Sequence, residues 1–348
     1  MNTLRVGIDG KSLLPPRTGV GRYLAGLLGG LEELALEDLA VEVLRPPAPR
    51  STVLWTLWDL QVVSRRGFSV LHLPFYYGPW APRCPTVLVV HDLLVLEHPE
   101  WFRPARLHPI RLLLPASARR AAAVVTFATA VAEAIAERLH LEPSRLRVIP
   151  HGVDRHLFRV PGADEIAAVV ARWGLSRPYL ACLGAVEPRR GVDLAVAAVH
   201  ALRQVWGELE LVLVGPLRAP VPCLKAAPPW VRRLGHVADE ELGPLVAGAA
   251  AVLAPSRAEG FDLPVLEALA CGALVVASDI PPHREHFAGG VQFFSSGDAE
   301  SLTAATRRVL EDSSLAASLR ASGLELASRF RWCDSARAHV AVWREVGG

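Results

Sequence analysis

Short runs of consecutive apolar residues alternate along the chain with longer segments in which apolar residues recur every three or four positions. The short runs predict buried strands and the periodic segments predict helices. In the first half, strands are predicted at residues 4–9, 41–44, 69–73, 86–90, 123–127 and 146–149. Helices are predicted at about 20–34, 55–65, 104–121 and 130–139. Strand–helix alternation with this spacing predicts a parallel sheet with helices on both faces.

The alternation pauses over residues 155–177, where Pro and Gly predict a linker, and then restarts. The second half has predicted strands at 179–183, 209–214, 251–253 and 273–276, and predicted helices at 192–205, 239–247, 264–271 and on through 328. We therefore predict an α/β chain of two Rossmann-like, doubly wound domains, 1–165 and 175–330, with a last helix at 331–348. In such folds ligands bind at the carboxyl ends of the strands, so we expect the site in the cleft between the domains.

Charge and composition narrow the function classes. The formal net charge is +2, which argues against a large nucleic-acid footprint, and the positive charge comes from 35 Arg and two Lys. The N-terminus runs directly into a strand without a signal-peptide core, which predicts a cytoplasmic protein. The most apolar stretches, 121–132 and 245–255, fall short of the ~20 residues that cross a bilayer. Peripheral membrane attachment stays open, because the arginines could form a basic patch.

The segment 256–272, SRAEGFDLPVLEALACG, places two carboxylates eight positions apart. Glu259 lies in a Gly-containing loop after a strand, Pro264 suits the first helical position, and Glu267 then lies about one turn inside the helix. The unpaired amides of residues 261–265 would favour an anion at the helix start. Two isolated Glu residues would also fit an ordinary solvated helix, but the fixed order of Gly, Phe and Pro around them favours a site.

This segment resembles the E-x7-E motif of the family 4 (group 1) retaining glycosyltransferases, S-x-x-E-G-F-G-L-P-x-L-E-A-M-A-x-G-x-P-V-V. The resemblance implies the two-domain GT-B fold, with the last helix returning to the N-terminal domain. It implies that Glu259 acts near the transferred sugar and that Glu267 binds the nucleotide ribose. It also places Phe261, Asp262 and Leu263 against the donor. Asp262 stands where Gly is usual, which adds a charge beside the sugar-binding amides.

The segment 183–191, LGAVEPRRG, puts Arg189 and Arg190 after the end of a strand. Guanidinium groups bind phosphate bidentately, although the residues alone would also fit a solvated basic turn. The segment resembles the family's G-x-x-E-P-R-K-N/G stretch, whose basic pair grips the donor diphosphate. The resemblance therefore assigns donor binding to both arginines and a catalytic role to Arg190, which replaces the usual Lys.

Three further matches carry weaker signals. Gly19 lies in PPRTGVGRY at 15–23, which is no dinucleotide fingerprint but resembles the family's T-G-I-G-R-Y loop on the donor. His91 and Asp92 follow a predicted strand and resemble a family H-D-L, with His91 directed at the donor sugar and Asp92 on the acceptor side or bracing the loop. Val237 ends a stretch that contacts the nucleotide base in the family. Lesser matches at 124–130, 149–154 and 330–332 extend the resemblance over nearly the whole chain.

The resemblance implies transfer of a hexose, with a lean to mannose, from a GDP- or UDP-sugar to a glycan or lipid-linked acceptor. Retention and a front-face mechanism come from the family. No Asp-x-Asp pair ends a predicted strand, so we expect no metal and no other cofactor. A non-catalytic nucleotide-sugar-binding protein and an inverting enzyme on this fold stay open. An NAD-dependent dehydrogenase would need G-x-G-x-x-G after a strand, which neither half supplies.

Overall fold

The computed structural model describes residues 3–348 apart from 15–17, 48–50, 103 and 176–177. Its contacts divide the chain into two compact units. Unit 1 comprises Met1–Gly152 and Phe330–Gly348, and unit 2 comprises Val153–Arg329. The division falls at Gly152, earlier than the predicted residue 165.

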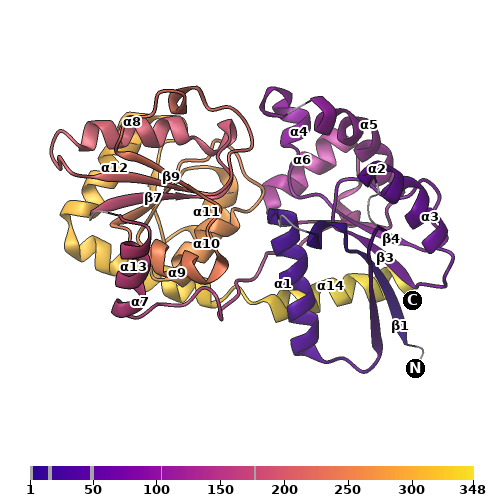
Figure 1. The fold of residues 1–348 in the computed structure, drawn as a ribbon. Helices are drawn as coiled ribbons and strands as arrows, with labels where there is room; N and C mark the ends of the chain where they lie inside the picture. Colours follow the sequence, from indigo (N-terminus) through magenta and orange to yellow (C-terminus); the bar gives the residue numbers. More distant parts are fainter. Residues whose placement is uncertain (1–2, 15–17, 48–50, 103, 176–177) are drawn as a thin grey trace. The chain divides into compact units, whose positions relative to one another are not determined.

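Unit 1 is built on a six-stranded parallel sheet in the order β2-β1-β3-β4-β5-β6 (Figure 1). Its strands are β1 Leu4–Asp9, β2 Leu39–Leu44, β3 Val70–Leu73, β4 Thr86–Val89, β5 Ala123–Thr126 and β6 Leu146–Val148. Its helices are α1 Gly19–Leu34, α2 Thr52–Leu54, α3 Leu60–Val63, α4 Leu94–Glu97, α5 Pro104–Arg120, α6 Thr129–Leu139 and α14 Trp332–Gly347. Strands β3, β4 and β5 are buried along their whole length, as expected where helices cover both faces of a parallel sheet.

Unit 2 repeats this plan with the strand order β12-β11-β10-β7-β8-β9, also all parallel. Its strands are β7 Tyr179–Leu183, β8 Glu210–Val214, β9 Val231–Gly235, β10 Ala251–Ala254, β11 Val275–Ser278 and β12 Gln292–Phe294. Its helices are α7 Ala163–Arg172, α8 Val192–Leu202, α9 Asp239–Ala247, α10 Leu263–Ala270, α11 Pro281–Phe287, α12 Ala299–Glu311 and α13 Ser313–Ser328. The predicted fold class, two Rossmann-like α/β domains, is confirmed.

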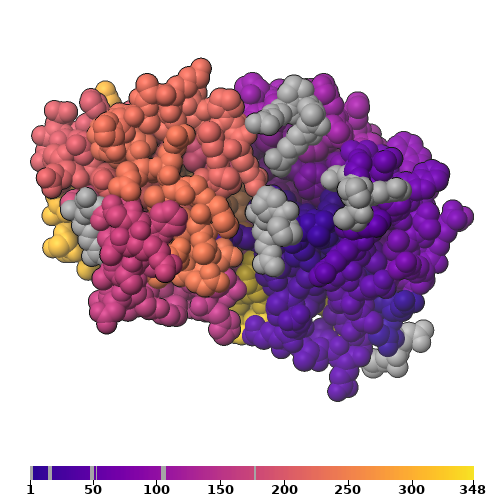
Figure 2. Space-filling view, in the orientation of Figure 1, coloured from indigo at the N-terminus to yellow at the C-terminus, as the bar shows by residue number. Residues whose placement is uncertain are grey.

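The last helix, α14, packs beside α1 in unit 1, as the resemblance implied (Figure 1). The backbones approach so closely that a Cβ on Gly30 would lie 2.3 Å from the Trp332 carbonyl oxygen. In the space-filling view, most of α14 is hidden behind the indigo and violet residues of unit 1 (Figure 2). Trp343 on this helix is fully buried, so α14 is part of the unit 1 core.

A buried chain of hydrogen bonds fastens α14 to the sheet. The Tyr23 hydroxyl from α1 lies 3.0 Å from His72 Nε2 and 2.9 Å from His339 Nε2. His339 Nδ1 donates to the Ser335 carbonyl, so its Nε2 accepts from Tyr23, whose oxygen then accepts from His72. Trp343 Nε1 completes the chain by donating to His72 Nδ1 at 3.4 Å. Burial lowers the pKa of His339 to about 4, which keeps the ring neutral at pH 7.

Among the elements that differ from the sequence prediction are α7, β9 and β12. The predicted linker contains α7, because Gly162 and Gly174 bracket a helix: the Glu165 carboxylate accepts from the Gly162 amide at 2.7 Å, and Gly174 follows with φ +57°. Strands β9 and β12 were not predicted, since β9 carries two arginines and β12 has only three residues. No helix in the described part of the chain is long and apolar enough to cross a membrane.

Candidate functional site

The strand order of unit 2 reverses between β7 and β10, which pair in parallel at the centre of its sheet. Loops that leave the carboxyl ends of such strands diverge and leave room for a ligand. The loop after β7 forms a 3-10 turn, Pro188–Arg190, and the loop after β10 carries Glu259 into α10. The predicted arginine pair and the predicted Glu therefore meet at this one switch point.

The two loops are pressed together by their backbones. Gly191 has φ +63°, and a Cβ there would lie 2.0 Å from the Pro255 carbonyl oxygen, so only glycine fits. The Arg257 amide donates to the Arg189 carbonyl at 2.8 Å. The Arg257 guanidinium holds Asp193 at the start of α8 in a two-pronged pair of 2.9 and 2.6 Å. Arg257 thus ties the basic loop to the acidic loop.

Glu259 contacts both predicted arginines. Its carboxylate accepts from Arg189 Nη1 at 2.7 Å, lies 3.0 Å from Arg190 Nη1, and accepts from the Ser256 hydroxyl at 2.8 Å. Arg189 also pairs through Nε with Glu187 at 2.6 Å. Only 9% of Glu259 is exposed, so these charges stand in a partly desolvated setting where ionic hydrogen bonds are strong. These contacts fix the positions of both guanidinium groups.

Asp262 extends the network inward. Its Oδ1 accepts from Arg190 Nη1 at 2.7 Å, and its Oδ2 lies 3.2 Å from His283 Nε2. His283 Nδ1 donates to the Ser278 carbonyl at 2.9 Å, and the Ser278 hydroxyl donates to the Ser256 carbonyl at 2.6 Å. A doubly protonated imidazole satisfies both ring contacts, because a carbonyl and a carboxylate only accept. The contacts close into a ring of six residues: Ser256, Glu259, Arg190, Asp262, His283 and Ser278.

The charges in the ring stabilise one another against desolvation. Burial alone would raise the pKa of Asp262, but Arg190 and His283 outweigh it and hold that pKa well below its usual range. Burial alone would lower the pKa of Arg190, but Asp262 and Glu259 outweigh it and raise that pKa. The Asp262 side chain is therefore an ionised internal partner. A donor contact at this residue stays a prediction and would fall to its main chain.

Helix α10 begins at Leu263, one residue after Asp262 of the ring. Asp262 takes the left-handed conformation with φ +78° just before Leu263, the first residue of the helix. Phe261 anchors the turn by packing on the His286 and Phe287 rings at 4.7 and 5.7 Å. The Leu263 amide has no intrahelical acceptor, as at any helix start, whereas Pro264 has no N–H group and the Val265 amide donates to the Asp262 carbonyl at 3.0 Å. Glu267 lies one turn further along and is 9% exposed.

The predicted residues of unit 1 lie at the ends of its strands. His91 follows β4, and its Nε2 donates to the Pro74 carbonyl at 3.0 Å. Burial lowers the pKa of His91, which favours a neutral ring with a lone pair on Nδ1. Asp92 accepts from the Tyr76 hydroxyl at 2.8 Å and from the Leu94 amide at 3.1 Å, so it braces the loop and the start of α4.

The remaining predicted positions are less informative. Gly19 is the first residue of α1, and a Cβ there would meet nothing within 4 Å. Pro15–Arg17 of the same motif lie outside the described residues. Val237 follows β9 in unit 2 and is 3% exposed. Among the residues that the structure describes, no group of three or more His, Cys, Asp or Glu side chains could hold a metal ion; metal independence stays a prediction.

Sequence reasoning missed His283 and Arg257. His283 comes from α11, which follows β11, and nothing in its local sequence distinguishes it from a surface histidine. Arg257 lies inside the E-x7-E segment at a position without a fixed residue in the family pattern. The signal that could have found it is the acidic Asp193 in the first turn of α8.

Comparison with known proteins places the chain in a family. The model for Glycosyltransferase Family 4 matches residues 19–157, and the model for Glycosyl transferases group 1 matches residues 177–312. The serotype-specific mannosyltransferase WbdA of Escherichia coli is 24% identical over 284 residues, which are 76% of this chain and 33% of WbdA. The chain thus spans about a third of the length of that relative.

Two further proteins are similar over more of their length. The O-antigen chain mannosyltransferase B of Escherichia coli is 26% identical over 308 residues, 86% of this chain and 78% of that protein. The crystal structure of Anabaena Alr3699/HepE in complex with UDP-glucose superposes with a TM-score of 0.76 at 19% identity, covering 98% of this chain and 99% of that one. The fold, the charged switch point and both family models agree, and the chain belongs to the group 1 (family 4) glycosyltransferases.

Proposed function

We propose that the chain transfers a hexose from a nucleotide-diphosphate sugar to a hydroxyl group of a glycan or lipid-linked acceptor, on the cytoplasmic side of a membrane that it contacts peripherally. The anomeric configuration is retained and no metal is required. The observation that carries the proposal is the pair Arg189 and Arg190, held against Glu259 at the switch point of the unit 2 sheet.

The arginine pair suits a departing diphosphate. Charge builds on the leaving phosphate as the bond to the sugar breaks, and preorganised cations stabilise it without rearranging. Both carboxylate partners of Arg190 contact Nη1, so the guanidinium has further N–H groups for a phosphate. The Leu263 amide at the start of α10 adds a donor, and we assign Glu267, one turn along the helix, to the ribose. Losing one such donor typically costs about 3 kcal/mol of transition-state stabilisation.

We assign the remaining roles to His91 and Asp92, as the resemblance implies. The neutral His91 imidazole, fixed through Nε2, offers Nδ1 to a hydroxyl of the donor sugar. Asp92 keeps the His91 loop in shape and serves the acceptor side indirectly. The leaving phosphate takes up the proton of the attacking hydroxyl on the same face of the sugar, so no side chain is required as a nucleophile.

The sugar and nucleotide are assigned from relatives. WbdA and the O-antigen enzyme carry mannosyltransferase in their names, which supports mannose. The UDP-glucose complex of HepE keeps UDP-sugars in consideration. A thermal-shift panel of GDP- and UDP-hexoses separates these donors, because a donor at 100 times its dissociation constant stabilises the fold by about 2.7 kcal/mol.

Turnover decides between an enzyme and a non-catalytic binding protein. The donor identified by thermal shift is incubated with the protein in EDTA, and released sugar is followed by NMR, which also reports its anomer. We expect hydrolysis with retention, and a loss of more than about 100-fold in Arg190→Ala. Thermal unfolding of this variant is measured alongside, because Ala leaves Glu259 and Asp262 without their shared cation. Donor binding with no turnover under any condition would identify a binding protein.

A further inference from the structure

An apolar stripe runs along the outside of unit 1. Leu54, Trp58 and Val62 are 54, 68 and 53% exposed, and they recur every four residues through α2, the π-helical turn Trp55–Asp59 and α3. Residues spaced by four lie on one face of a helix, so the three side chains form a continuous strip. The opposite face is fixed to the core, since Trp55 is buried and its Nε1 donates to Asp9 at 2.8 Å.

A second exposed tryptophan, Trp80, lies in a loop that contacts α3 and the residue after it. The loop that carries Trp80 is tied to α3, because the Ala81 amide donates to Gln61 Oε1 at 2.6 Å and the Arg83 amide donates to the Ser64 hydroxyl. Trp80 is 62% exposed. Tryptophans this exposed are unusual, because an indole ring normally gains about 2 kcal/mol or more by burial.

Arginines surround these apolar side chains. Trp80 stacks against the Arg120 guanidinium, whose carbon lies 4.5 Å from the ring centre, and α5 also exposes Arg119, Arg111 and Leu112, the last at 76%. Arg65, Arg66 and Arg83 are exposed near α3. The sequence has no acidic residue from 60 to 91 or from 101 to 132. The apolar-basic face combines exposed apolar side chains with an excess of arginines over the nearby acidic residues Asp59 and Glu42; its members are Leu54, Trp58, Val62, Trp80, Leu112, Arg65, Arg83, Arg111, Arg119 and Arg120.

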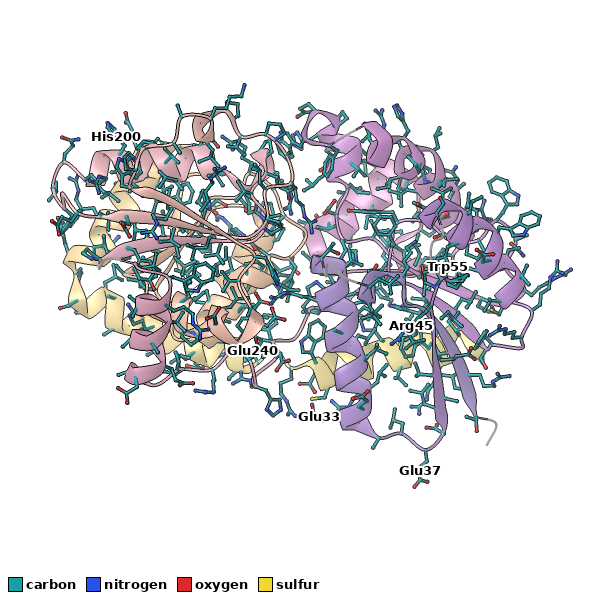
Figure 3. The ribbon with its side chains drawn as sticks, viewed as in Figure 1. Glu33, Glu37, Arg45, Trp55, His200 and Glu240 are labelled. Atoms are coloured by element: carbon teal, nitrogen blue, oxygen red, sulfur yellow. The ribbon has the colours of Figure 1, made fainter. Side chains whose placement is uncertain are left out.

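A hollow of about 380 Å³ adjoins the strip between β2 and the α2–α3 segment. Trp58, Val62, Arg45 and Arg66 line it, together with the acidic residues Glu42 and Asp59. Arg45 and the buried Trp55, which also borders the hollow, are labelled in Figure 3. Arg66 pairs with Glu42 at 3.1 Å in an exposed contact that an anion can replace. The hollow therefore offers two guanidinium groups beside an aromatic ring.

We propose that the apolar-basic face docks the protein on an anionic lipid bilayer. Indole rings favour the boundary between acyl chains and headgroups, and arginines near an anionic surface are attracted to it. The centre of a protein–protein interface is depleted of charged residues, whereas here arginines lie next to the apolar side chains. The inference rests on the proposed function and deepens it, because it names the surface that makes the proposed membrane contact.

Vesicle flotation tests the docking surface with the full chain. Vesicles of phosphatidylcholine alone are compared with vesicles that contain phosphatidylcholine and phosphatidylglycerol in equal parts. We expect binding to the anionic vesicles, weakened by salt, and a loss of about tenfold or more in the double variant Trp58→Ala/Trp80→Ala. Arg65→Glu/Arg119→Glu should abolish the preference for phosphatidylglycerol.

Matched controls in unit 2 are Val205→Ala, which trims a side chain 60% exposed, and the exposed Arg307→Glu; both should bind as the wild type does. Failure of the wild type to float, undiminished binding of the tryptophan variant, or self-association through this face in sedimentation velocity would overturn the proposal. Donor hydrolysis without vesicles is measured on the same samples. The hydrolysis rate should be the same in the wild type and in every variant. A variant that hydrolyses donor but does not float has lost only docking, whereas a wild type without hydrolysis would contradict the proposed function.

Discussion

Replacing Asp262 by Asn tests the buried ring by removing one charge and little else. Asn has the same size as Asp and also tolerates the positive φ of this position. In the folded protein the Asp262 carboxylate has a pKa well below its usual range, because Arg190 and His283 outweigh the effect of burial. In the unfolded chain the same carboxyl titrates near 3.9.

The sign and size of the effect follow from these two states. A depressed pKa contributes stability that is complete above the unfolded pKa and is lost as the pH falls towards the folded pKa. Between about pH 5 and pH 3 the unfolded chain takes up a proton at Asp262 that the folded protein does not. Linkage then predicts a loss of about 1.2 kcal/mol from this residue alone. Asp262→Asn cannot show that loss.

Urea unfolding of the wild type and of Asp262→Asn at pH 5 and pH 3 measures this loss of stability. Other carboxyl groups titrate equally in both proteins, so the stability difference between wild type and variant should shrink by about 1.2 kcal/mol on going from pH 5 to pH 3. In the control Glu208→Gln, which alters an exposed carboxylate of unit 2, the stability difference from the wild type should be the same at pH 5 and pH 3. If the advantage of the wild type over Asp262→Asn is the same at both pH values, Asp262 is not an ionised partner of Arg190 and His283.

Three other substitutions probe the supports of the site and of unit 1. Gly191→Ala should destabilise unit 2 by more than about 2 kcal/mol in thermal unfolding, because its Cβ would clash with the Pro255 carbonyl and φ is positive; a neutral effect would contradict the close loop contact. Arg257→Ala should weaken donor binding about tenfold in titration calorimetry with little change in folding, since the basic loop loses its brace. Tyr23→Phe should cost about 2–4 kcal/mol in urea unfolding by stranding two imidazole nitrogens. The wild type should also lose stability in unit 1 as the pH falls from about 6.5 towards the lowered pKa of His339, and a flat profile there would refute the neutral ring.

Much of the architecture follows from the order of apolar runs, because parallel strands buried on both faces have few polar positions. The exceptions have local causes. Residues 163–172 looked like a linker because Gly162 and Gly174 are breakers by type, although here they are the two ends of α7. Strand β9 lies at the edge of the unit 2 sheet, where charged side chains such as Arg232 and Arg233 can reach solvent. Its sequence therefore lacks the run of apolar residues that marks a buried strand.

Only the two loops that carry the recognised motifs were predictable in the site. Arg190 and Glu259 each lie in a strand-to-helix connection, and the switch-point rule brings such connections together. His283 could not be predicted, because its contact with Asp262 depends on the order in which β10 and β11 lie in the sheet. The inward orientation of the Asp262 side chain was equally hard to predict, because a positive φ is uncommon for a residue other than glycine.

The return of α14 has a consequence for biosynthesis. Unit 1 is made of the first 152 residues and of residues 330–348, with all of unit 2 between them in the chain. On the ribosome, the N-terminal sheet is synthesised first but lacks Trp343 and His339 until every strand of unit 2 has emerged. Unit 2 is translated after the N-terminal part of unit 1 but can complete its core first. Until α14 is synthesised, part of the interior of unit 1 stays exposed to solvent.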